Sequence, residues 1–198
     1  MTRVIGITGG IASGKSTVTA YLRKRGYEVI DADDVVHQLQ QKGGRLYQVL
    51  VEEFGTSILT KDEELNRAQL GRLVFEEDEV RKRLSYLQDS IIREALIAER
   101  DRLAECEEVF FMDIPLLFEL GYEGVVSEVW LIVLAPELQV ERLMERNQLD
   151  QEAAKQRIAA QMPLEEKKKR TPYQIDNDGE KQATYAQVDQ LLAQIERR

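Results

Sequence analysis

The sequence has few features of a membrane, secreted or nucleic-acid-binding protein. Its longest apolar run, Val129 to Ala135, is far shorter than the roughly 20 residues that a helix needs to cross a bilayer. Its one cysteine, Cys106, cannot form a disulfide within the chain. Acidic residues (36) outnumber basic ones (27), whereas a non-specific nucleic-acid binder needs an excess of lysine and arginine. We therefore expect a cytoplasmic protein with a small-molecule substrate and no nucleic-acid or membrane partner.

Histidine is nearly absent as well. Because His37 is the only histidine, a Ser-His-Asp triad or a histidine-containing zinc site has little to draw on, which excludes the corresponding hydrolases and zinc proteins. His37 itself is either an ordinary helix residue or a contact to the substrate. The 198 residues, 43% hydrophobic and 32% charged, are typical of one globular domain with a sizeable core.

Apolar runs alternate with segments of helical spacing, which predicts an α/β fold. The run from Arg3 to Thr8 stops at a Gly-rich turn, a helix is expected from Lys15 to Gly26, and a short strand follows at 27–30. A strand, turn, helix and strand in this order favour a right-handed parallel crossover. Further strands are expected at 109–112, 129–134 and 173–176.

Two helical insertions interrupt this pattern. Residues 35–104 are polar and rich in helix signal, and residues 137–170 are helical and strongly charged. Arg142 and Arg146 are four residues apart, so they share one helix face, which either clamps transferring phosphoryl oxygens or is simply solvated. The basic run 167–170 is expected at a solvated helix end.

Gly9 to Ser16 match the P-loop motif G-x-x-x-x-G-K-[ST] at every fixed position. In such a loop, backbone N–H groups and the N-terminus of the next helix surround a polyphosphate, and the glycines let the main chain approach it. Lys15 would reach the β and γ phosphates, and the Ser16 hydroxyl would bind Mg²⁺. The predicted ATP-binding residues are Gly10, Ile11, Ala12, Ser13, Gly14, Lys15, Ser16 and Thr17.

Acidic residues follow two of the predicted strands. Asp31 and Asp33 come after the second strand, at the sheet edge where ligands of open α/β folds bind, and a carboxylate there accepts a proton from a substrate hydroxyl. Residues two apart on an extended segment face the same side, so we expect both carboxylates on one side of the chain. The alternative is that Asp31 or Asp34 only caps the next helix. Asp113 closes the run 109–112 and is the candidate acid beside Mg²⁺.

The chain resembles the dephospho-CoA kinase family in several motifs. They are the loop from Thr8 to Thr17, Asp31-Ala32-Asp33 with His37, Asp113-Ile114-Pro115-Leu116-Leu117-Phe118-Glu119, and Arg170 to Asn177 with Ile175-Asp176-Asn177. The resemblance implies that ATP, with Mg²⁺, phosphorylates the ribose 3′-hydroxyl of dephospho-coenzyme A, the last step of coenzyme A synthesis. It also implies Asp33 as the base and Arg142 or Arg146 as a lid arginine.

The same resemblance implies a fold and a set of site residues. The fold is a three-layer α/β/α P-loop kinase with a five-stranded parallel sheet. Its nucleotide-binding core comprises 1–34, 105–136 and 171–198, with a helical coenzyme A domain at 35–104 and a lid at 137–170. The candidate residues are Asp33, Lys15, Arg142 and Arg146 for catalysis, Asp31, Asp33 and His37 for the substrate, and Ser16 and Asp113 for the metal.

The chain departs from the family pattern at two places. Ala12 stands where the family usually has glycine, which matters only if the loop needs a positive φ there. Thr171-Pro172 precede Tyr173 where Ala-Asp is more usual.

Three alternatives stay open from the sequence. A nucleotide or nucleoside kinase would share this architecture. A GTPase switch would need N-K-x-D or T-K-x-D, but Thr60-Lys61-Asp62-Glu63 ends in glutamate and precedes the third strand. An ATP-binding regulator without turnover would not need the aspartates beside the loop. The oligomeric state is not encoded in any pattern we recognise.

Overall fold

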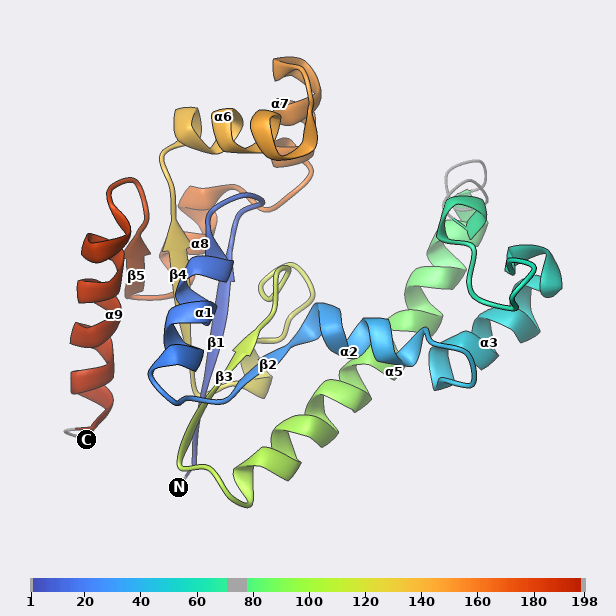
Figure 1. Cartoon of the computed structure of the whole chain (residues 1–198), viewed down its shortest axis with the longest axis horizontal. Coiled ribbons are helices and arrows are strands. Elements are labelled where there is room, and N and C mark those ends of the chain that lie inside the picture. The colour runs from blue at the N-terminus through green and yellow to red at the C-terminus, as the bar shows by residue number, and fades with distance from the viewer. Residues whose placement is uncertain (1, 71–77, 197–198) are drawn as a thin grey trace. The chain divides into compact units, whose positions relative to one another are not determined.

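Five parallel strands form the sheet that carries the site. The computed structural model describes residues 2–70 and 78–196, and within them the strand order is β2-β3-β1-β4-β5. Each neighbouring pair of strands is parallel, which confirms the predicted fold class. The strands, seen in Figure 1, are β1 Arg3–Gly9, β2 Val29–Asp31, β3 Val109–Asp113, β4 Glu128–Val133 and β5 Tyr173–Asp176.

The central strands are apolar because both faces of the sheet are covered. Every residue of β1 after Arg3 is buried, and so are the last four residues of β3. On one face, α1 (Lys15–Lys24) and α9 (Lys181–Glu196) pack against the strands and against each other. The core on this face includes Ile5, Ile7, Phe111, Trp130, Ile132 and Ile175 from the strands and Val18, Leu22, Val188 and Leu192 from the two helices.

The carboxyl ends of β1, β2 and β3 lie along one edge of the sheet. Asp113 of β3 is paired with Ile7 of β1 on one side and with Asp31 of β2 on the other. β1 ends at Gly9 and continues directly into the P-loop. The P-loop and two of the predicted acids therefore share the edge at which ligands of open α/β sheets bind.

Three helices lie between β4 and β5: α6 Pro136–Asn147, α7 Gln151–Ala159 and α8 Leu164–Arg170. A proline at the first position starts α6, and the Asp150 carboxylate caps α7 by accepting a hydrogen bond of 2.8 Å from the Ala153 N–H. A short 3₁₀ helix, η2 Glu123–Val125, precedes β4. α8 contacts β4, and its Lys167 is only 1% exposed. The prediction of a solvated helix end at 167–170 is therefore wrong for Lys167.

Residues Ala32–Arg102 form a compact unit apart from Met1–Asp31 and Leu103–Arg198. This unit is helical, with α2 Ala32–Leu39, α3 Arg45–Phe54, η1 Thr56–Ile58 and most of α5 Asp78–Ala104. Its own core contains Leu46, Leu50, Ile58, Leu70, Leu84 and Ile91. The predicted division into a core, a coenzyme A domain and a lid stays a prediction.

Across residues 2–70 and 78–196, no helix combines the length and the apolar composition that crossing a membrane requires. Cys106 is exposed in the turn that follows α5.

Candidate active site

The P-loop is a tight turn with two residues in the left-handed region. Gly14 has φ +91° at the start of α1, and Ala12 has φ +60°. The loop therefore does need a positive φ at position 12, where an L-residue other than glycine costs about 1–2 kcal/mol. Gly9 is required for another reason, since a Cβ on it would lie 2.5 Å from the Ser13 hydroxyl and 2.9 Å from the Ile132 carbonyl oxygen.

Lys15 and Asp113 come together at the sheet edge. The Lys15 Nζ lies 3.6 Å from the Asp113 Oδ1, and their side chains are 19% and 10% exposed. Asp113 is held there by its place at the end of β3, and Lys15 by its place in the first turn of α1. A partly buried lysine beside a carboxylate, at the mouth of a phosphate-binding loop, is suited to bind polyphosphate charge.

The same edge offers oxygen donors that fit Mg²⁺. Mg²⁺ is usually held by one or two carboxylates, retained waters and substrate phosphates rather than by a full protein cage. Asp113 supplies a carboxylate here, and the exposed Ser16, next to Lys15 in α1, supplies a hydroxyl. Within the described part of the chain, no three histidine, cysteine or acidic residues gather as a metal site. The donor set thus fits a metal bound jointly with phosphate.

The acids after β2 differ from the prediction. Asp31 is the last residue of β2, but α2 begins at Ala32, so Asp33 and Asp34 lie in the first helical turn, where both are exposed. The expectation that Asp31 and Asp33 face one side of an extended segment is wrong, because the chain turns into a helix between them. Asp31 remains beside Asp113 through the strand register.

Only one of the two predicted arginines lies beside the P-loop. Arg142 donates from Nη2 to the Asn177 carbonyl oxygen at 3.0 Å, and its Nη1 lies 3.7 Å from where a Cβ on Gly14 would stand. Arg146, one turn later on α6, is exposed and donates from Nε to the Asn147 side chain at 2.9 Å.

His37 lies in the helical unit 32–102. Its Nδ1 is 2.6 Å from the Arg67 Nη2, and because arginine only donates, His37 is the acceptor. Both line a groove of about 530 Å³ together with Lys42. Lys42 pairs with Glu63, and their hydrogen bond holds the pKa of the Glu63 carboxyl below its ordinary value.

Asn177 is a site residue that motif chemistry did not identify. Its side-chain N–H donates to the Ser13 carbonyl oxygen at 2.8 Å, and its Oδ1 accepts from the Thr184 hydroxyl at 2.9 Å. Both side chains are buried. The sequence marked Asn177 only as part of a family signature, because the partner lies 164 residues away.

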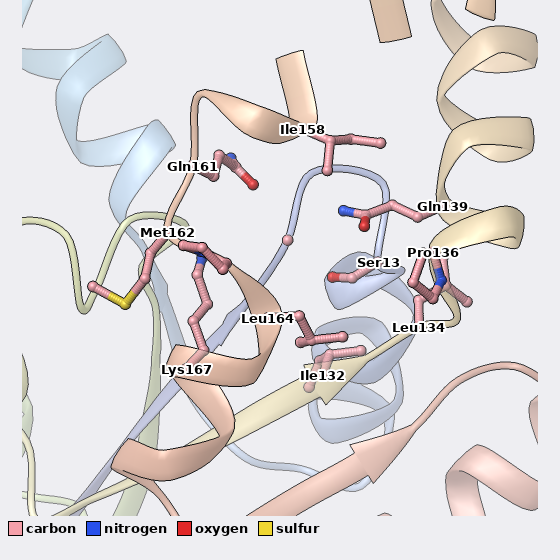
Figure 2. A pocket seen from close by; sticks show the side chains of 12 residues that line it. Ser13, Ile132, Leu134, Pro136, Gln139, Ile158, Gln161, Met162, Leu164 and Lys167 are labelled. Atoms are coloured by element: carbon pink, nitrogen blue, oxygen red, sulfur yellow. The ribbon is translucent and has the colours of Figure 1, made fainter. Parts of the chain in front are cut away.

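A cavity of about 180 Å³ lies beside the P-loop, with Gly10 and Ser13 in its lining. Figure 2 shows the side chains that line it. Lys167 lines it, and its Nζ lies 2.7 Å from the Glu119 Oε1, which also accepts from the Met162 N–H at 3.1 Å. Two glutamines, Gln139 and Gln161, line the cavity as well. The two glutamines were not predicted, because nothing in their local sequence distinguishes them from solvated helix positions.

The comparisons with known proteins agree on one family. The model of the dephospho-CoA kinase family matches residues 3–183. The dephospho-CoA kinase of Streptococcus mutans serotype c is 53% identical over 196 residues, which cover 99% of each chain. The solved structure of TT1252 from Thermus thermophilus has a TM-score of 0.80 at 36% identity and covers 98% of this chain and 97% of that one. A Campylobacter jejuni dephospho-CoA kinase has a TM-score of 0.76 at 30% identity and 98% coverage of both.

Proposed function

The chain belongs to the dephospho-CoA kinase family, and we propose that the P-loop edge of its sheet is where the γ-phosphate of ATP passes to the ribose 3′-hydroxyl of dephospho-coenzyme A. The activity is the ATP-dependent phosphorylation of dephospho-coenzyme A, a step of coenzyme A biosynthesis. The observation that supports this location is the 3.6 Å approach of Lys15 to Asp113 where β1 and β3 end.

Each step of the transfer has a candidate residue. The hydroxyl oxygen forms a bond to the γ-phosphorus, and the bond from that phosphorus to the ADP oxygen breaks. We assign Lys15 and the P-loop N–H groups to the phosphate oxygens on which negative charge develops. Arg142 is the second cation, because its guanidinium lies beside Gly14. Asp33 accepts the hydroxyl proton, since it follows the carboxyl end of β2 by two residues.

Asp113 and Ser16 are the residues we assign to Mg²⁺. When bound, the metal supplies positive charge to the phosphate oxygens of ATP. Asp31, beside Asp113 in the register, and His37 are assigned to the substrate.

We further propose that residues 35–104 bind dephospho-coenzyme A and that residues 137–170 act as a lid. In that segment α8 contacts β4 and its Lys167 pairs with Glu119, while α6 is tied to the P-loop through Gln139 and to Asn177 through Arg142, so any closing movement belongs mainly to α7. A cytoplasmic location and the absence of a nucleic-acid partner complete the proposal, supported by the single cysteine and the acidic excess.

The experiment is an ADP-release assay with a panel of acceptors: dephospho-coenzyme A, nucleosides, nucleoside monophosphates and shikimate-like alcohols. We expect dephospho-coenzyme A alone to raise ADP release well above the rate with water, and phosphorus NMR of the product to show a 3′-phosphomonoester. Stimulation by a nucleotide and not by dephospho-coenzyme A would instead establish the alternative, a nucleotide or nucleoside kinase of the same architecture.

A further inference from the structure

The peptide groups of Ile11, at the tip of the P-loop, are held by two glutamine side chains. The Ile11 N–H donates to the Gln161 Oε1 at 2.8 Å, and the Ile11 carbonyl oxygen accepts from the Gln139 Nε2 at 2.8 Å. Gln139 comes from α6 and Gln161 from the segment between α7 and α8. Figure 2 shows the two side chains approaching the loop from these separate segments.

The loop needs such support because its backbone is strained. The residue after Ile11 is Ala12, a non-glycine residue at φ +60°, and Gly14 follows at φ +91°. A residue held in a sparsely populated backbone region persists only where its surroundings fix it. The two hydrogen bonds to Ile11 fix the peptides on both sides of that residue, immediately before the strained position.

The space beside the loop is shaped for Gln139. Gly10 is not a fixed position of the P-loop motif, yet a Cβ on it would lie 2.5 Å from the Gln139 Nε2. A side chain at position 10 would therefore displace the Gln139 amide from its place beside the loop. The Gln139 side chain is nearly buried, with the residue 9% exposed, so losing its partner would leave polar groups unsatisfied.

We propose that Gln139 and Gln161 are positioning residues, which hold the Ile11 peptides so that the following N–H groups of the loop are set for the phosphates of ATP. They act through the loop and contact no reacting atom. The proposal rests on the proposed use of this loop for ATP. It assigns opposite hydrogen-bonding roles to the pair: Gln139 must donate, whereas Gln161 must accept.

This difference gives a matched test, because glutamate has the size of glutamine but only accepts when ionised. Gln161→Glu keeps the acceptor for the Ile11 N–H. Gln139→Glu loses the donor and places a carboxylate against the Ile11 carbonyl oxygen. The two variants add the same charge to the same region, so each controls for the other. Gly10→Ala displaces Gln139 without changing it.

We would measure ATP binding by calorimetry, together with KM for ATP and for dephospho-coenzyme A. We expect Gln139→Glu and Gly10→Ala to weaken ATP binding and raise its KM by about tenfold or more, with KM for dephospho-coenzyme A unchanged. Gln161→Glu should stay within about threefold of the parent, as one retained hydrogen bond predicts.

Equal losses of ATP affinity in the two glutamate variants would overturn the proposal, because such losses would reflect the added charge alone. Unchanged ATP binding in both variants would overturn it as well. If Gln139→Glu does not fold, Gln139→Met and Gln161→Met replace the pair: both remove a hydrogen bond to Ile11, and both must weaken ATP binding. The parent enzyme tests the proposed function separately, since its failure to phosphorylate dephospho-coenzyme A would leave the ATP-binding comparison intact.

Discussion

The side-chain amide of Asn177 donates a 2.8 Å hydrogen bond to the carbonyl oxygen of Ser13, which joins the end of β5 to the P-loop. The Thr184 hydroxyl orients that amide by donating to its Oδ1 at 2.9 Å. A Cβ on Gly14 would lie 2.0 Å from the Asn177 Nδ2, so the glycine and the asparagine are matched. The loop is thus supported from the far end of the chain.

Asn177→Asp should destabilise the fold and weaken ATP binding together. The carboxylate cannot donate to the Ser13 carbonyl oxygen. That buried oxygen would lose its donor and face a negative charge, which should lower the free energy of unfolding by about 2–3 kcal/mol. Urea unfolding and ATP calorimetry measure the two effects. Asp178→Asn, the reverse exchange at the exposed neighbour, is the control and should change neither by much. A wild-type ATP affinity in Asn177→Asp would show that the loop does not depend on this bond.

Asp33→Asn should lower kcat by about 10² or more, because it removes the base that accepts the hydroxyl proton. ATP binding should remain nearly intact, since the phosphate loop is untouched. Asp34→Asn changes the other exposed acid of the same helical turn and should retain most activity. Steady-state kinetics with ATP calorimetry test this, and an equal loss of ATP affinity in Asp33→Asn would make Asp33 a structural or metal-binding residue.

Buried Lys167 and partly buried Glu119 should show strong coupling. Lys167→Met leaves the Glu119 carboxylate without its cation and should lower the free energy of unfolding by about 3 kcal/mol. Adding Glu119→Gln removes that charge and keeps an acceptor for the Met162 N–H, so the double variant should recover much of the loss. A double-mutant cycle in urea measures the coupling, and purely additive effects would contradict the ion pair.

Ala12→Gly should raise the free energy of unfolding by up to about 1 kcal/mol, because glycine adopts φ +60° without the strain that alanine meets. Ala12→Val should lower it, since a β-branched side chain fits this region worst. Thermal melting of the three proteins gives the order. If Ala12→Gly is less stable than the parent, the loop does not hold position 12 in the left-handed region.

The local sequence determined the sheet and the phosphate loop, because both depend on short-range patterns. The apolar run of β3 and its closing Asp113 were predicted from adjacent residues, and the glycine and lysine spacing of the P-loop follows from the geometry of its own backbone. Prediction from the local sequence failed where it depended on the boundary between a strand and a helix. The start of α2 at Ala32 separates Asp31 from Asp33, although the two look alike in the sequence.

The tertiary structure alone decided which polar residues support that loop. Gln139 and Asn177 contact it from 128 and 164 residues away, and the buried Lys167 pairs with Glu119 of a distant segment. In the sequence, Lys167 belongs to a basic helix end that has every sign of solvent exposure. A hydrogen bond or ion pair between distant segments leaves no periodicity and no spacing to detect, because its partners meet only when the sheet has formed.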